Sequence, residues 1–331
     1  MSVLSAPVAK DVAALIRQRL GRPLEPFDIW YDGFKARSSI PEADLNKAVS
    51  GRYPELAAFQ ADLPDVLGRL GFAPDTAKFL ASRIRVDPAR GAGHALGAGM
   101  RTDDARLRTR VPKGGMDYKG FNIAMHELGH TVEQTLSLNR VDRVLMSGVP
   151  NTAFTEAMAF LFQDRDLDQL GMGRADASAK AARAVDTYWM TFEIGGVALV
   201  DMAMWRYLYD HPDATQASLR EFVVAKAIEI WNRYYAPVLG VKDSPLLAIY
   251  SHMVSSGLYL PDYPIGHLLQ FQFERAIEGK NLATEMERMC VQGRLTPDAW
   301  MRGAVGGPIT SQPLVDAAAE GVKVLKKRGA P

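Results

Sequence analysis

Five consecutive residues combine the side chains that a metal-dependent hydrolysis needs: His126-Glu127-Leu128-Gly129-His130. On a helix, residues four apart share a face, so the imidazoles of His126 and His130 can reach one metal ion. Glu127 follows His126 directly and lies beside the metal, where a base for an activated water belongs. The pattern H-E-x-x-H therefore predicts a Zn²⁺ site with Glu127 as general base.

The residues around this motif predict a helix over 121–138. Apolar residues recur there near helical spacing, without an internal proline: Ile123, Met125, Leu128, Val132, Leu136 and Leu138. Gly129 costs about 1 kcal/mol relative to alanine inside a helix. Two explanations stay open for it. It could let another backbone approach the metal closely, or it could be tolerated without a purpose.

A third metal ligand is expected from the next helix, for which Asn151 or Thr152 is a suitable N-cap. Glu156 lies inside that helix among apolar and small residues. A carboxylate there is costly to bury unless it is paired or bound to metal. We therefore expect His126, His130 and Glu156 to hold zinc, with a fourth position left for water.

Other roles for these side chains remain open. The two histidines could be ordinary core residues, and Glu156 could form a salt bridge with an arginine. Glu133 and Asp142 compete with Glu156 as third ligand. Glu133 would point along the helix of the histidines rather than across the metal. We therefore expect it on a solvated face or as a neighbour behind the ligands.

The composition is typical of a globular protein. Of 331 residues, 47% are hydrophobic and 23% charged, and the net charge of +1 argues against a nucleic-acid partner. Cys290 is the only cysteine, which excludes an intrachain disulfide and a cysteine-type zinc site. No apolar stretch has the length of a membrane span, and the N-terminus lacks the features of a secretory signal. We therefore expect a cytoplasmic protein without membrane contact.

Most of the chain is expected to be helical. Apolar periodicity and Pro or Gly punctuation predict helices at about 8–20, 42–50, 54–71, 74–84, 121–138, 152–168, 175–209, 215–233, 244–256, 263–278, 281–292, 296–303 and 312–327. One region differs: the glycine-rich segment 91–99, a turn signal at 102–105 and the alternating segment 107–111 predict a small antiparallel β-hairpin. A dinucleotide-binding glycine pattern and a G-x-S-x-G serine elbow are both absent. The simplest expectation is a single mostly helical domain, residues 1–331.

Together these features resemble the gluzincin zinc oligopeptidases. The similarity is greatest to the angiotensin-converting-enzyme-like dipeptidyl carboxypeptidases and next to the thimet oligopeptidase and neurolysin group. It rests first on the H-E-x-x-H helix, on a glutamate about thirty residues after the first histidine, and on helical surroundings. Further similar stretches are His94-Ala95, Val200–Arg206, Tyr263 followed by Gln270-Phe271-Gln272-Phe273, and Met301–Pro308. The resemblance extends in patches over residues 55–327.

The resemblance implies a multi-helix zincin fold, with the hairpin near the active site, and hydrolysis of peptide bonds in short peptides. It implies Tyr263 as hydrogen-bond donor to the oxyanion that develops on the scissile carbonyl. It assigns substrate binding to His94-Ala95, with His94 on an edge strand that pairs with an extended peptide. His252 and Tyr259, each one residue from the matched position, are the candidates for binding a substrate's C-terminal carboxylate.

Two departures from the family keep other functions open. Family members are much longer, and this chain matches mainly their C-terminal, zinc-bearing half, without the N-terminal lid. Ser251, Met253 and Leu260 occupy the matched positions of the family's carboxylate-binding side chains, and Asp262 that of its chloride-binding arginine. A peptide-binding scaffold without turnover is therefore an alternative. A zinc hydrolase of non-peptide amides is another, because the same metal chemistry serves both substrates.

Overall fold

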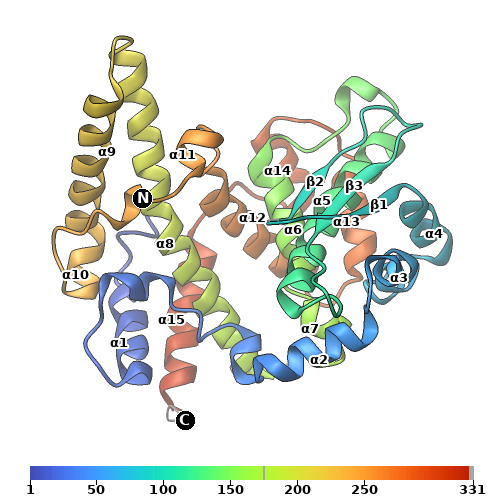
Figure 1. Ribbon diagram of the computed structural model, residues 1–331, viewed down its shortest axis with the longest axis horizontal. Coiled ribbons are helices and arrows are strands. Elements are labelled where there is room, and N and C mark those ends of the chain that lie inside the picture. The colour runs from blue at the N-terminus through green and yellow to red at the C-terminus, as the bar shows by residue number, and fades with distance from the viewer. Residues whose placement is uncertain (92, 174–175, 328–331) are drawn as a thin grey trace. The chain divides into compact units, whose positions relative to one another are not determined.

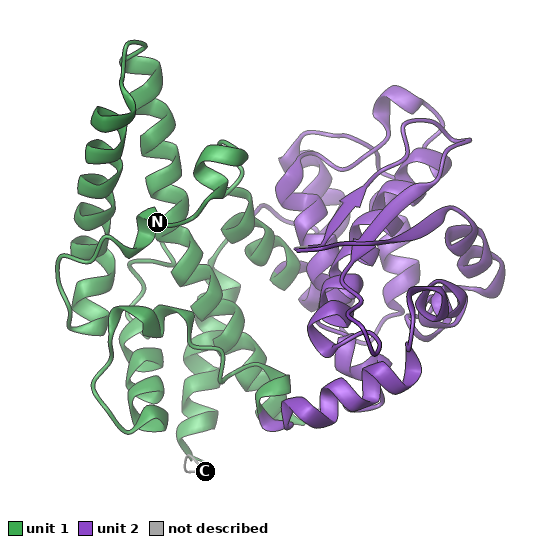
Figure 2. Ribbon diagram, viewed as in Figure 1, with its two compact units in different colours: residues 1–38, 175–271, 310–331 green, residues 39–174, 272–309 purple. Residues whose placement is uncertain are grey.

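The computed structural model describes residues 1–91, 93–173 and 176–327, which fold into two compact units (Figure 2). Unit 1 comprises Met1–Ser38, Ala175–Phe271 and Thr310–Pro331, and unit 2 comprises Ser39–Arg174 and Gln272–Ile309. Neither unit is a continuous stretch of chain. Because each is assembled from segments that the other interrupts, we propose that both belong to one domain, as the sequence predicts.

The described residues of unit 1 form helices joined by loops, without a strand, and the long helix α8 lies beside α15 and α9 (Figure 1). Its helices are α1 (Val8–Leu20), α8 (Ala177–Asp210), α9 (Gln216–Ile230), α10 (Ala236–Leu239), α11 (His252–Ser255), the first part of α12 (Asp262–Ile277) and α15 (Gln312–Lys327). Short 3₁₀ turns occur at Pro26–Trp30, Ala36–Ser39 and Leu246–Ala248, and a π-helical turn at Trp231–Tyr235 continues α9. Buried aliphatic and aromatic side chains from α1, α8, α9 and α15 form one core.

Unit 2 combines helices with a three-stranded sheet (Figure 1). Its helices are α2 (Glu42–Arg52), α3 (Leu56–Arg69), α4 (Pro74–Ser82), α5 (Tyr118–Arg140), α6 (Thr152–Gln163), α7 (Asp166–Gln169), the end of α12, α13 (Leu282–Cys290) and α14 (Pro297–Val305). A 3₁₀ turn at Val144–Met146 lies between α5 and α6. The strands are β1 (Ile84–Pro88), β2 (His94–Leu96) and β3 (Ala105–Thr109), in the order β1-β3-β2.

The predicted mostly helical fold is confirmed, and so is the antiparallel pairing of β2 with β3. The sheet nevertheless has a third strand, because β1 pairs with β3 in parallel. The helix predicted over 74–84 ends at Ser82, and Ile84 already belongs to β1. Five residues of alternating burial are too few to identify a strand whose partner lies about twenty residues along the chain.

Two other predicted helices are wrong in part. The helix expected over 244–256 is only the 3₁₀ turn Leu246–Ala248 and the single turn α11. Asp243 with a φ of 58° and Leu258 with a φ of 60° bracket this region, and neither conformation continues a helix. The helix expected over 152–168 divides into α6 and α7. Two residues within predicted segments, Ala92 and Ala175, lie outside the described residues.

Helices α5 and α6 pack very closely at Gly129. A Cβ atom at Gly129 would lie 2.6 Å from the Cα atom of Ala159 and 2.8 Å from the carbonyl oxygen of Met158. Only a residue without a Cβ atom allows the two backbones this approach. Of the two explanations for Gly129, the structure therefore selects the first: another backbone lies against it.

Both helices begin at side-chain caps. The carboxylate of Asp117 accepts a hydrogen bond from the amide of Gly120 at the start of α5, and Asn151 caps α6 through the amide of Ala153. Among the described residues, no helix combines the length and the apolar composition that crossing a membrane would require.

Candidate metal centre

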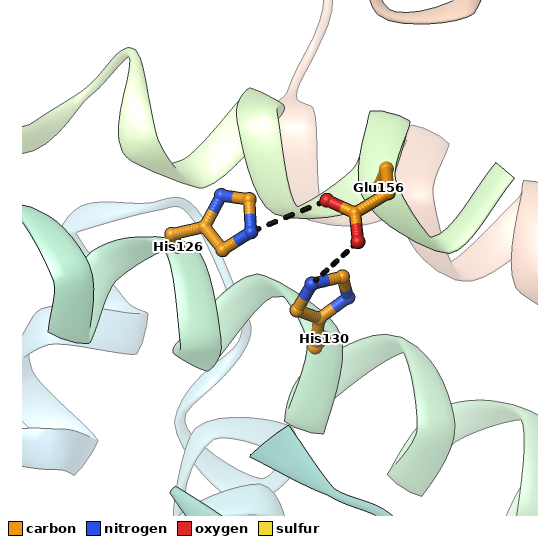
Figure 3. A group of neighbouring side chains, drawn as sticks. All are labelled: His126, His130 and Glu156. Atoms are coloured by element: carbon orange, nitrogen blue, oxygen red, sulfur yellow. Dashed lines mark ion pairs between the residues drawn. The ribbon is translucent and has the colours of Figure 1, made fainter. Parts of the chain in front are cut away.

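The side chains of His126, His130 and Glu156 converge in unit 2, across the α5–α6 contact (Figure 3). Nε2 of His126 lies 3.4 Å from Oε2 of Glu156, and Nε2 of His130 lies 3.7 Å from Oε1 of the same carboxylate. The three ligand atoms lie within 4.8 Å of one another. Glu156 is only 2% exposed. The helix that carries Glu156 thus faces the two imidazoles and not the solvent.

These spacings fit a divalent cation. Metal–ligand bonds of about 2.0–2.2 Å at tetrahedral angles place neighbouring ligand atoms about 3.3–3.5 Å apart. The two nitrogen–oxygen distances match this separation or exceed it by a few tenths of an ångström. Two imidazoles and one carboxylate leave one coordination position, which is the arrangement of catalytic rather than structural zinc sites. The residues present could therefore hold a divalent cation.

The two imidazoles differ in their protonation equilibria. Burial and the nearby His126 lower the pKa of His130 to about 4, so this ring is neutral at pH 7. Burial also lowers the pKa of His126, but the hydrogen bond and the charge of Glu156 outweigh it, and the net shift is upward. The carboxylate thus favours a positive charge at the position that the two nitrogens face.

A chain of hydrogen bonds orients the His126 ring. Nδ1 of His126 lies 3.0 Å from Oε1 of Gln163, the Gln163 amide donates to Oδ1 of Asn122 over 2.8 Å, and the Asn122 amide donates to Asp166 over 2.7 Å. Because the carboxylate of Asp166 accepts, each amide turns its oxygen toward the previous member of the chain. His126 must then donate from Nδ1, which leaves Nε2, the ring nitrogen nearest Glu156, as the atom that can bind a metal.

Glu127 lies beside the ligand group and not within it. Its side chain is buried, and burial raises the pKa of Glu127 to about 7, partly opposed by the charge of His126. The backbone amide of Ala95 on β2 donates a hydrogen bond to this carboxylate. A carboxyl group with a pKa near neutrality can both take up and release a proton at pH 7.

Strand β2 lies directly over Glu127. A Cβ atom at Gly93 would come within 2.2 Å of Cγ2 of Ile123 and 3.2 Å of Cγ of Glu127. Among the residues that the structure describes, β2 pairs with β3 on one side only, so its other edge is not paired within the sheet. His94 is exposed on this edge strand. The sequence-predicted pair His94-Ala95 is therefore brought next to Glu127.

Three further candidates form a separate group in unit 1. The rings of Tyr259 and Tyr263 lie 5.4 Å apart, and that of His252 lies 6.2 Å from Tyr263 and 6.4 Å from Tyr259, measured between ring centroids. Tyr263 occupies the first turn of α12, and the side chains of both tyrosines are half-buried. The structure thus brings together the three side chains that the resemblance selects from this segment.

The competing third ligands lie elsewhere. Asp142 is exposed just after α5. Glu133 is buried and accepts a hydrogen bond from Thr155 on α6, so of the two positions expected for it the structure excludes the solvated face and agrees with the position behind the ligands. Sequence reasoning missed Thr155 and Gln163. A signal existed for Gln163, which lies seven residues after Glu156 on the same helical face, but not for Thr155, because adjacent residues of a helix do not share a face.

No protein-family model and no curated protein matches the sequence. Solved structures do share its fold. Trypanosoma cruzi metallocarboxypeptidase 1 is 15% identical, with 97% of this chain and 78% of that chain covered at a TM-score of 0.51. A Chlamydophila abortus protein assigned as a peptidase is 13% identical, with 97% and 55% covered at 0.56. A Bacillus anthracis protein assigned as an oligoendopeptidase F is 12% identical, with 96% and 56% covered at 0.54.

At these identities the likeness establishes the fold alone. The chain spans little more than half the length of two of these proteins. The chain therefore shares its mostly helical fold with these proteins, and its own residues place a His-His-Glu group in that fold.

Proposed function

We propose that this protein is a zinc-dependent peptidase that hydrolyses short peptides. One observation carries this proposal. The imidazoles of His126 and His130 and the buried carboxylate of Glu156 converge beside Glu127, a second carboxylate that can accept a proton. Nitrogen and carboxylate ligands with one open position suit Zn²⁺ better than Mg²⁺, which prefers six oxygen ligands. The fold supports the same class of enzyme.

Residues of unit 2 bind the metal, transfer the proton and bind the peptide. His126, His130 and Glu156 hold the metal, which when bound polarises the scissile carbonyl and acidifies water. Glu127 accepts the proton of the attacking water and delivers it to the leaving amine. The Ala95 amide holds the Glu127 carboxylate during both transfers. The open edge of β2 offers backbone groups to an extended peptide, and His94 donates to a substrate carbonyl.

The roles proposed for unit 1 rest on the family resemblance. Tyr263 donates a hydrogen bond to the oxyanion of the tetrahedral intermediate, and a donor of this kind is worth about 3–4 kcal/mol of the barrier. His252 and Tyr259 bind the C-terminal carboxylate of the substrate. Support for this assignment is that the three rings form one cluster.

The position of the cleaved bond separates three related activities. Removal of single C-terminal residues is carboxypeptidase action, loss of C-terminal dipeptides is the converting-enzyme mode, and internal cleavage is oligoendopeptidase action. Mass spectrometry of the products from one defined decapeptide distinguishes them. We favour a C-terminal exopeptidase, because His252 and Tyr259 can donate to a terminal carboxylate.

The test is peptide cleavage by protein with measured zinc content. We expect one zinc per chain, cleavage of a quenched peptide library, and loss of both zinc and activity in Glu156→Ala. Glu127→Gln should keep the zinc and the fold while activity drops by several orders of magnitude. Full activity of Glu127→Gln would end its assignment as base.

Stoichiometric zinc without cleavage of any peptide would reject the peptidase and leave the binding scaffold. Hydrolysis of acylated amines alone, with peptides untouched, would instead select the non-peptide amide hydrolase. Wild-type protein and Glu127→Gln serve as the matched pair in both assays, because only turnover and not binding depends on the base.

A further inference from the structure

Glu133 is a buried carboxylate that lies one hydroxyl group away from the His130 imidazole. We propose that Glu133 is a positioning residue that fixes the metal-binding tautomer of His130 through the hydroxyl of Thr155. This inference deepens the proposed function, since it concerns the same metal ligands. Its first consequence, however, is visible in the metal-free protein, where it is independent of any peptidase activity.

The direction of two hydrogen bonds carries the argument. Oγ1 of Thr155 donates to Oε2 of Glu133 over 2.9 Å, and Oγ1 also lies 3.0 Å from Nδ1 of His130. A hydroxyl group has a single proton. Because that proton points to the carboxylate, Thr155 can only accept from His130. The ring must therefore carry its proton on Nδ1, and Nε2 is left with the lone pair that a metal needs.

The surroundings of Glu133 fit a group that is kept as an acceptor. It is 2% exposed, and its second oxygen, Oε1, accepts from the hydroxyl of Ser137 over 2.9 Å. Hydroxyl donors thus reach both oxygens, so a carboxylate accepts at each of them. Burial raises the pKa of Glu133, and the two hydroxyl donors and the charge of Arg294 oppose this shift only in part, so burying this carboxylate costs more free energy than burying a well-packed apolar side chain of similar volume. Retention of this costly group is explained if the histidine depends on it.

Removal of the acceptor should release the hydroxyl proton. In Glu133→Leu, the Thr155 hydroxyl is free to donate to Nδ1 of His130. The proton of the ring then moves to Nε2, the atom that faces Glu156. In that tautomer the ring presents an N–H group to the metal position. The ring must therefore return to the other tautomer before Nε2 can bind a metal.

Three variants separate tautomer control from packing. Glu133→Leu removes the acceptor. Glu133→Gln keeps an amide oxygen for Thr155 and turns its NH₂ group toward Ser137, whose hydroxyl can accept. Ser137→Ala deletes only the outer hydrogen bond and is the control. A second pair of variants changes the Thr155 hydroxyl that lies between Glu133 and His130: Thr155→Val removes it and Thr155→Ser keeps it. This pair tests the proposal even if Glu133→Leu folds poorly.

The measurements are the ¹⁵N shifts of the His130 ring in zinc-free protein, the zinc affinity by chelator competition, and the unfolding midpoint. We expect wild type, Glu133→Gln, Ser137→Ala and Thr155→Ser to protonate Nδ1. Glu133→Leu and Thr155→Val should shift the proton toward Nε2 and weaken zinc binding about 10- to 100-fold. A merely structural role would lower the unfolding midpoint without moving the proton.

Protonation of Nε2 in zinc-free wild type would overturn the inference. Unchanged ring shifts and zinc affinity in both Glu133→Leu and Thr155→Val would do the same. Failure of the proposed function has a different signature, because it leaves these ring shifts intact while the zinc-loaded wild type cleaves no peptide.

Discussion

A methyl group added at Gly129 should cost this protein both stability and metal affinity. The Cβ atom of alanine would lie 2.6 Å from the Cα atom of Ala159 and 2.8 Å from the Met158 carbonyl oxygen. Ordinary contacts begin at about 3.4 Å, and both obstacles are backbone atoms that no rotamer change can move. Helices α5 and α6 must therefore separate by about 0.8 Å.

Two opposing contributions set the change in stability. Alanine is favoured over glycine in a helix by about 1 kcal/mol, while overpacking of a close contact typically costs about 1–3 kcal/mol. We therefore expect Gly129→Ala to lower the free energy of unfolding of the metal-free protein by up to about 2 kcal/mol.

We expect Gly129→Ala to reduce zinc affinity as well as the stability of the fold. The nitrogen–oxygen distances of 3.4 and 3.7 Å already match or exceed the separation of about 3.3–3.5 Å in a tetrahedral site, so a further displacement strains it. A loss of at least about tenfold in zinc affinity, or about 1.4 kcal/mol, is expected.

The assay is urea unfolding with and without zinc, together with chelator competition. Gly68→Ala is the matched control, because Gly68 lies inside α3 and an added Cβ atom meets nothing within 4 Å. That variant should gain up to about 1 kcal/mol. If Gly129→Ala proves as stable as Gly68→Ala and binds zinc like wild type, the close contact between α5 and α6 does not set the metal geometry.

Three further outcomes follow from the structure. Gly93→Ala should displace β2 from α5, because its Cβ atom would lie 2.2 Å from Cγ2 of Ile123; we expect kcat to fall while atomic absorption shows unchanged zinc content. Burial raises the pKa of Glu193 from its ordinary 4.5 to about 7. The folded state therefore holds a proton that the unfolded state loses, and stability should fall by up to about 3 kcal/mol as the pH rises from about 4.5 to 7. Urea titrations at pH 5 and pH 8 should show a loss in wild type that is smaller by up to about 3 kcal/mol in Glu193→Gln, where the raised pKa of Glu127 still contributes. Tyr263→Phe should lower kcat by about 10²–10³ with little change in KM, and an unchanged kcat would remove Tyr263 from the oxyanion.

The sequence was sufficient wherever a property depends on neighbours along one helix. The 3.6-residue period already places His126 and His130 on one face, and Asn151 marks the start of α6. The cost of burying a carboxylate among apolar residues was enough to select Glu156 as the expected third metal ligand. These inferences are local, because helix geometry relates residues three or four apart without reference to the rest of the chain.

The sequence was insufficient wherever a partner comes from a distant segment. Strand β1 exists because β3 pairs with it, and the hydroxyl of Thr155 reaches Glu133 only because α5 and α6 touch at Gly129. The direction of the hydrogen bond chain from Asp166 to His126 likewise depends on three separate elements.

The order of the residues thus determined which side chains could bind a metal and which carboxylate could move a proton. The tertiary structure alone decided the distances between these groups and the atoms that they turn toward one another. The physical reason is that ligand geometry and tautomer choice depend on hydrogen-bond partners and backbone contacts, which only the packing of α5, α6 and β2 supplies.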